Sequence, residues 1–272
     1  MRHRIAGFIL AAGIACAQPP PKFEVASIRP SDSADRRLFL DVQPGGRFIA
    51  RNFSVKRLIE WAYGIKDFQI SGGPGWMGSD LYDISANAEN SGNTDKSNLR
   101  LQSLLAERFQ LAIRRETKDM PVYAVVVAKN GPKFKDAKES DPNIVDLSKR
   151  SDLAGRGGRP RFTMIRRGRL TAQGGDMRLL TSELSNFLGR TVVDKTGLRG
   201  TYDLKLEWQP DENQVAMFQA LGVPEGFGAP APDPLGPSLF AALEEQLGLR
   251  LDSQRGPVET FVIERIERPS EN

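Results

Sequence analysis

The stretch Tyr82-Asp83-Ile84-Ser85-Ala86 has a counterpart farther along the chain, Tyr202-Asp203-Leu204-Lys205-Leu206. In both stretches, apolar and polar side chains alternate, which is the pattern of a strand with one buried face. Each stretch follows a short apolar segment and a glycine-containing loop, at residues 72–76 and 194–200 respectively. A match of this kind indicates an internal repeat, and the flanking segments extend it.

Upstream of each stretch, a glycine turn precedes a short strand and an amphipathic helix. The helices follow Ser54 and Asp176, whose side chains can cap the first helical turn. Apolar residues recur at helical spacing in both segments, and Gly64 and Gly189 stand where each helix should end. The same element order therefore precedes both Tyr-Asp strands.

Downstream of each stretch, a second helix leads into two further strands. We expect these helices at residues 98–108 and 238–246. In both cases an alternating strand is followed by a turn that ends in Pro-Val, at Pro121-Val122 and Pro257-Val258, and then by a last strand. Because proline is typical of turns, this order predicts a hairpin at the end of each repeat.

The sequence therefore predicts an α+β fold made of two tandem repeats, each a mostly antiparallel sheet with two helices packed on one face. The first repeat, with a leading strand near residues 23–28, spans residues 18–129. The second spans residues 168–272 and contains a Pro/Gly-rich insertion at 210–237. A basic, flexible connector at 130–167 joins them. The pattern leaves open whether the repeats share one sheet or form two lobes.

The N-terminus predicts export. A basic segment, Met1-Arg2-His3-Arg4, precedes an uncharged, mostly apolar run that ends in Ala15-Cys16-Ala17. This is the pattern of a signal peptide over residues 1–17 that is cleaved after an Ala-x-Ala site. The run is shorter than the roughly 20 residues that a membrane span needs. We expect a periplasmic or extracellular protein without a transmembrane helix after cleavage; a lipoprotein anchored through Cys16 is the less favoured alternative.

Cleavage would remove the single histidine, His3, and the single cysteine, Cys16. We then expect no disulfide, no Ser-His or Cys-His nucleophile pair, and no zinc site with His or Cys ligands. The sequence also lacks a nucleotide-binding loop. We therefore predict no catalytic residue, no cofactor and no metal. A length of 272 residues with 39% hydrophobic residues is enough for a sizeable core.

Five segments together resemble a secreted bacterial family known as soil-associated proteins. They are residues 23–30, 72–76, 121–123, 193–202 and 269–272. The family is of unknown function, and its domain is sometimes attached to membrane sensors of the antirepressor-metalloprotease type. The resemblance implies an extracytoplasmic sensing or binding role. It supplies no catalytic residues, and this sequence shows no metalloprotease portion.

Three tryptophans and one arginine are the candidates for contact with a ligand or partner. Trp76 closes the glycine-rich loop and either offers an aromatic platform or folds back onto the first helix. Trp61, Trp208 and Arg199 complete the set. The basic residues of the connector could also bind an anionic polymer, but we favour a solvated linker and expect no specific nucleic acid.

Paired carboxylates are the remaining route to acid–base catalysis. Asp83 and Asp203 occupy the same place in both repeats, but an aspartate at a strand start usually bonds a turn, so we favour a structural role. The segment Asp194-Lys195-Thr196-Gly197 resembles the phosphorylated loop of P-type ion pumps. We interpret it instead as a tight turn, with Gly197 at positive φ and Asp194 bonded to nearby backbone N–H groups.

These features favour a non-enzymatic, extracytoplasmic binding or interaction module with an unknown protein or glycan partner in the cell envelope. Its ligand would lie between the lobes or against the loop at 210–237. Two alternatives stay open: a carboxylate-dependent hydrolase of an extracellular polymer, and a structural subunit of an envelope assembly whose strand edges pair with neighbours. A cleft with two acids would favour the hydrolase, and an open, uncharged edge strand would favour the assembly.

Overall fold

The computed structural model describes residues 20–32, 38–43, 45–88, 96–137, 162–220 and 236–269. In this part of the chain the protein is an α+β fold with three four-stranded sheets and six helices. The predicted signal peptide, Cys16, the middle of the connector and residues 221–235 of the insertion lie outside the described residues.

The first half of the chain contains, in order, β1 (Val25–Pro30), β2 (Phe39–Val42), β3 (Phe48–Ser54), α1 (Val55–Tyr63), the short 3-10 helix η1 (Asp67–Gln69), β4 (Ile70–Gly72), α2 (Trp76–Ser79), β5 (Leu81–Asn87), α3 (Ser97–Arg108) and β6 (Ala112–Val127). The second half contains β7 (Lys135–Asp136), β8 (Phe162–Arg166), β9 (Arg169–Gly175), α4 (Met177–Leu188), β10 (Val192–Asp194), β11 (Tyr202–Glu207), α5 (Glu212–Ala220), α6 (Leu239–Ala242) with the π-helical turn η4 (Leu243–Leu247), and β12 (Leu249–Arg265).

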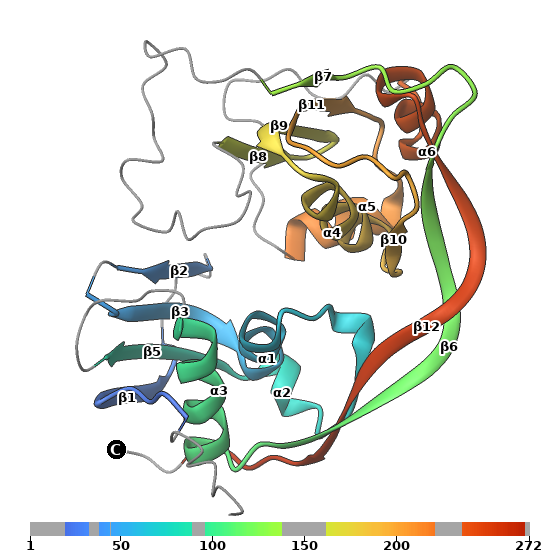
Figure 1. Cartoon of the computed structure of the whole chain (residues 1–272). Coiled ribbons are helices and arrows are strands. Elements are labelled where there is room, and N and C mark those ends of the chain that lie inside the picture. Colours follow the sequence, from blue (N-terminus) through green and yellow to red (C-terminus); the bar gives the residue numbers. More distant parts are fainter. Residues whose placement is uncertain are drawn as a thin grey trace, which may run out of the picture.

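The first lobe is the sheet β1-β5-β3-β2 with α1, α2 and α3. Helices α1 and α3 pack against each other and lie over one face of this sheet (Figure 1). Phe48, Leu58, Leu101 and Phe109 are fully buried between these layers. Burying a side chain of this size stabilises the fold by roughly 1.5–3 kcal/mol, so this cluster is a core in its own right.

The second lobe is the sheet β7-β11-β9-β8 with α4, α5, α6 and η4. Its buried cluster includes Leu170, Leu180, Trp208 and Leu243, and it shares no buried residue with the first cluster. Both lobe sheets have the same strand order when their strands are ranked along the chain. The predicted mostly antiparallel sheets with helices on one face are therefore present in each half.

The third sheet joins the lobes, with the order β10-β6-β12-β4. The long strands β6 and β12 pair antiparallel over almost their whole length and form a curved ribbon along one side of the molecule (Figure 1). Strand β4 of the first half pairs parallel with β12, and β10 of the second half pairs parallel with β6. Each long strand thus begins in its own lobe and ends in the other, where β12 buries Phe261 in the first core and β6 buries Val125 in the second.

The predicted terminal hairpins are absent, because both Pro-Val pairs lie inside continuous strands. Tyr123 donates its backbone N–H to the carbonyl of Thr191, the residue before β10. Pro121, two residues earlier, therefore directs its nitrogen to the same side, where β10 has not yet begun. Pro257 pairs with Asp119 and likewise directs its nitrogen away from β6. Both prolines thus occupy exposed edge positions, where a strand has no neighbour to receive an N–H.

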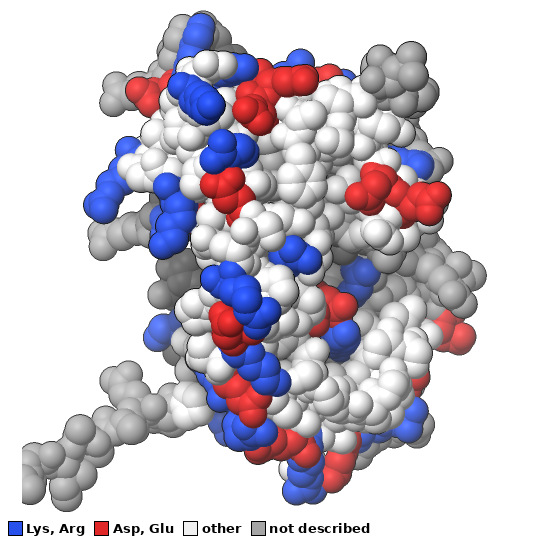
Figure 2. Space-filling view, turned by 90° about the vertical axis from the view of Figure 1, so that its right-hand side faces the viewer, with Lys and Arg blue, Asp and Glu red and all other residues white. Residues whose placement is uncertain are grey.

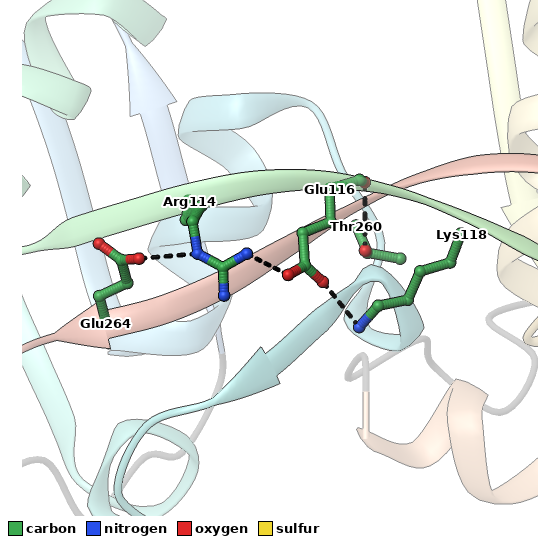
Figure 3. A network of polar contacts seen from close by, with 5 residues as sticks. All are labelled: Arg114, Glu116, Lys118, Thr260 and Glu264. Atoms are coloured by element: carbon green, nitrogen blue, oxygen red, sulfur yellow. Dashed lines mark hydrogen bonds and ion pairs between the residues drawn. The ribbon is translucent and has the colours of Figure 1, made fainter.

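The outward face of the ribbon is charged. Figure 2 shows basic and acidic side chains interleaved along a stripe that runs the length of this side. One network joins three residues of β6 and two of β12, as Figure 3 shows. Its contacts are Arg114 Nε to Glu264 (2.8 Å), Arg114 to Glu116, Lys118 Nζ to Glu116 (3.0 Å), and Thr260 Oγ1 to the Glu116 carbonyl (3.2 Å).

The connector is more structured at its ends than the sequence indicated. Strands β7 and β8 lie within the predicted connector and form part of the second sheet. Helix α5 begins the predicted insertion, and its Phe218 packs in the second core. The predicted N-caps Ser54 and Asp176 accept backbone hydrogen bonds from Arg57 and Leu179 (3.4 and 2.9 Å).

Candidate functional site

The two lobes meet in a polar cluster on the inner side of the ribbon. Lys66, in the loop after α1, donates from Nζ to Ser182 Oγ on α4 at 3.0 Å, a contact between the lobes. Figure 2 shows the surface hollowed between the lobes, beside the charged stripe. The residues of this interlobe cluster are Lys56, Glu60, Tyr63, Lys66 and Asp67 of the first lobe and Ser182 and Glu183 of the second.

Local hydrogen bonds fix the loop that carries Lys66. Gly64 ends α1 in the left-handed conformation, with φ of 64°, which turns the chain toward the second lobe. The Lys66 backbone N–H then donates to Gln69 Oε1 at 3.0 Å, and Gln69 Nε2 donates to the Glu259 carbonyl of β12 at 2.8 Å. Because this loop is bonded to the ribbon, the Lys66 side chain is held at the lobe boundary.

Glu60 is the most perturbed carboxyl of the cluster. Burial, helped by the negative charge of Asp67, raises the pKa of Glu60 from 4.5 to about 7, although the cations Arg57, Lys56 and Lys66 lower it. No hydrogen bond or ion pair reaches its carboxylate from the described residues. Glu60 is therefore a half-buried acid that gains or loses a proton near neutral pH.

Lys66 is perturbed in the opposite sense. Burial lowers the pKa of its ammonium, while the nearby carboxylates Glu183 and Glu60 raise it in part. Neither carboxylate lies within ion-pair distance, so in the described structure the ammonium donates only to the Ser182 hydroxyl. Asp67, by contrast, forms an ion pair with Lys56.

An aromatic group borders the cluster on the ribbon side. The ring centroids of Tyr63 and Phe261 lie 5.8 Å apart. The Arg115 guanidinium lies over the Phe261 ring, 5.3 Å from its centroid. Burial raises the pKa of the Tyr63 hydroxyl, against the effect of the Arg115 charge. The cluster therefore combines an acid, an ammonium, hydroxyl groups and an aromatic face.

Two of the predicted tryptophans are half-buried and pack on the core of the first lobe. Trp76 opens α2 and packs on the first core, while the Arg268 guanidinium lies over its ring at 5.1 Å and bonds Asp80 through two 3.0 Å contacts. Trp61 packs against Phe48 with 5.3 Å between ring centroids. The structure does not bring these two rings together into one aromatic groove.

Trp208 and Arg199 have opposite environments. Trp208 is only 2% exposed, packs against Phe187 and Phe218, and donates from Nε1 to Gln214 Oε1 at 2.9 Å. Its position in the second core leaves no open face for a ligand. Arg199 is exposed in the loop between β10 and β11.

The repeated aspartates bond backbone groups within their own lobes. Asp83 Oδ1 accepts the N–H of Asn52, and Asp203 Oδ1 accepts the N–H of Gly174, both at 3.0 Å. Asn52 and Gly174 have positive φ and sit where the strand register shifts. The two carboxylates serve different sheets, so the favoured structural role agrees with their contacts.

The Asp194 loop is the predicted turn. Asp194 Oδ1 accepts the Thr196 N–H at 2.8 Å and the Thr196 hydroxyl at 2.7 Å, and Gly197 has φ of 72°. The Asp194 carboxylate therefore stabilises the turn by accepting these two local hydrogen bonds.

Sequence reasoning missed Glu60, Tyr63 and Lys66. Glu60 and Lys66 stand in and just after an amphipathic helix, where charged residues are ordinarily solvated. Their burial depends on tertiary contacts, such as the bond from Lys66 to Ser182 of α4, which no local pattern encodes. Among the described residues, no group of three or more His, Cys, Asp or Glu side chains is placed to hold a metal ion, and no helix is both long and apolar enough to cross a membrane.

Comparison with known proteins gives one family. No curated protein and no solved structure matches the chain. A family model with the description "Protein of unknown function (DUF3738)" matches residues 56–266, a span that runs from the start of α1 to the end of β12. The chain therefore belongs to the DUF3738 family of proteins of unknown function.

Proposed function

We propose that the protein is a non-enzymatic binding or interaction module of the cell envelope that holds its ligand or partner at the interlobe cluster. Export rests on the signal peptide predicted over residues 1–17, and on the resemblance to a secreted soil-associated family. The partner is a protein or glycan outside the cytoplasm. The support for this ligand position is that Lys66 and Ser182 meet there from the two lobes, and that Lys66 has further N–H donors.

The proposal includes a tandem duplication as the origin of the two lobes. Its support is the equal strand order of the lobe sheets and the recurrence of left-handed residues at matching places. Asn52 and Gly174 stand at the two register shifts, and Gln110 and Gly248 stand between a helix and a long strand. Under this proposal β6 and β12 are equivalent strands, one from each copy, and each packs its second half on the other copy.

The Lys66–Ser182 contact carries the functional proposal. A charged side chain that is half-buried without an ion-pair partner costs free energy, and ionisable groups with perturbed pKa values are enriched at functional sites. Here the ammonium, a perturbed carboxyl and a tyrosine meet at the boundary of two separately packed lobes. Binding sites occur preferentially at such boundaries.

The hydrolase alternative has one specific observation in its favour. A carboxyl with a pKa near 7 beside a second carboxylate is the usual arrangement of a general acid, and Glu60 and Asp67 provide one. Asp67, however, is ion-paired with Lys56, which reduces its ability to act as a base or nucleophile. The assembly alternative is weakened at the ribbon by its edge prolines and charges.

The test is capture of envelope components by the full-length chain. Ser182→Trp places a bulky ring at the lobe contact, and Thr117→Trp places the same ring on the exposed ribbon as the matched control. We expect one component to be retained by the wild type and by Thr117→Trp, and to be lost with Ser182→Trp. Circular dichroism and urea unfolding establish that both variants are folded.

Two results would contradict the proposal. Equal capture by all three proteins would place the partner elsewhere on the surface. Absence of any retained component from the native envelope fraction would argue against a binding module.

A further inference from the structure

The ammonium of Lys66 has more N–H donors than acceptors among the described residues. It carries three N–H groups, and the Ser182 hydroxyl accepts only one of them among the described residues. Lys66 is itself half-buried, so bulk water does not fully replace the missing partners. The other cations nearby are already engaged, since Lys56 pairs with Asp67 and Arg115 lies 3.6 Å from Glu259.

We propose that Lys66, with Ser182 and Glu60, forms a site for an oxyanion, the carboxylate or phosphate group of a ligand that enters between the lobes. This inference rests on the proposed function and names its ligand class. Lys66 supplies the positive charge and two N–H donors, and the Ser182 hydroxyl supplies a further donor from the second lobe. An oxyanion would satisfy donors from both lobes at once.

Glu60 makes this binding depend on pH. Four charged groups shift the pKa of Glu60: Lys56 and Arg57 of α1, Lys66 of the loop and Asp67 of η1. The pKa of Lys66 is in turn raised by Glu60 of α1 and by Glu183 of α4. As a carboxylate, Glu60 repels an oxyanion at Lys66. As a neutral acid, it no longer repels the oxyanion. Because the pKa of Glu60 is about 7, an oxyanion whose own charge is constant over this range, such as acetate, should bind more tightly at pH 6 than at pH 8.

A cation fits the cluster less well. It would require Glu60 to be ionised, and it would have to approach a half-buried ammonium that repels it. Charge and donor count therefore favour an anion.

The experiment measures binding of inorganic phosphate and, separately, acetate by NMR titration of the full-length chain, at pH 6 and 8 and constant ionic strength. Lys66→Met removes the ammonium but keeps most of the side-chain volume, and Lys195→Met removes a lysine from an exposed loop as the control. We expect saturable binding with shifts at 66 and 182. Lys66→Met loses a charged hydrogen-bond partner of the anion, so its anion affinity should fall about tenfold or more. The affinity of Lys195→Met should equal that of the wild type. Glu60→Gln should bind acetate equally at both pH values. Phosphate gains negative charge between pH 6 and pH 8, so its affinities are compared between variants at one pH.

Phosphate-only or acetate-only binding would assign the oxyanion to one source and support the site. Equal affinity of wild type and Lys66→Met, or no saturable binding of either anion by the wild type, would overturn it. This failure is separable from that of the proposed function. Envelope capture that is lost with Ser182→Trp would then leave the interlobe location in place and remove only the ligand class.

Discussion

Asp83 Oδ1 lies 3.0 Å from the backbone nitrogen of Asn52, which has φ of 58° and stands at a register shift between β3 and β5. Asp203 and Gly174 make the same contact in the second lobe, also at 3.0 Å, where β11 pairs with β9. A bulge leaves one strand residue without a ladder partner, and the carboxylate satisfies the freed N–H. The aspartate of each Tyr-Asp pair thus stabilises a bend in its sheet.

Replacement of either aspartate should therefore destabilise the fold. Asp83→Ala and Asp203→Ala each leave a backbone N–H at the bulge without its acceptor, and we expect the free energy of unfolding to fall by about 1–3 kcal/mol. Urea unfolding measures this change. Glu245→Ala, at an exposed position of η4, serves as the control and should be near neutral. A loss of ligand binding without a loss of stability would show that the aspartates act in a site.

Two left-handed glycines should respond very differently to alanine. Gly189 has φ of 58° and open space around its missing side chain, so Gly189→Ala should cost only the backbone strain, about 1–2 kcal/mol. A Cβ at Gly248, with φ of 64°, would clash with the carbonyl oxygen of Gly131. We expect Gly248→Ala to lower the free energy of unfolding by about 3 kcal/mol or more. Equal costs in thermal unfolding would contradict the packing at the start of β12.

The stability of the wild type should fall as pH rises from about 4.5 to about 7. Over this range Glu60 is ionised in the unfolded chain but still protonated in the folded chain, so the folded chain holds the extra proton. The contribution is present below pH 4.5, is lost as pH rises through about 7, and amounts to at most about 3 kcal/mol. Urea unfolding at a series of pH values measures it.

Glu60→Gln isolates this contribution. The variant should match the wild type near pH 4 and exceed it in stability at pH 8, because its amide carries no charge to bury. A wild type and variant with parallel pH profiles would mean that Glu60 has an ordinary pKa.

Truncation of Trp208 and of Trp76 to alanine should lower the free energy of unfolding by different amounts. Trp208→Ala opens a cavity in the second core and leaves Gln214 without the indole N–H, so we expect a loss of about 3–5 kcal/mol. Trp76→Ala removes a half-buried ring and should cost clearly less. Differential scanning calorimetry checks both, and equal costs would contradict the core position of Trp208.

Local patterns predicted much of the fold. Helical spacing and caps identified α1 and α4 with their N-caps Ser54 and Asp176, because capping depends on residues a few positions apart. The alternation in the Tyr-Asp strands likewise identified β5 and β11. These features need no knowledge of tertiary contacts.

The pairing of the long strands could not be predicted in this way. Proline at 121 and 257 is equally compatible with a turn and with a strand edge, and only the neighbouring chain decides between them. The hairpin expectation was wrong because β6 and β12 pair with each other, and each supplies apolar side chains to the opposite core. The interlobe cluster depends on this same long-range pairing, so its residues escaped prediction too.

The most direct test of the account is site-specific photo-crosslinking in the native envelope fraction. A photoreactive benzophenone side chain replaces Glu183 at the lobe boundary in one variant of the full-length chain, and Glu245 on the exposed surface of η4 in another. We expect a defined adduct from position 183, competed by excess unlabelled wild type, and none from position 245. Adducts from position 245 alone, or equal adducts from both, would contradict the placement of the ligand between the lobes.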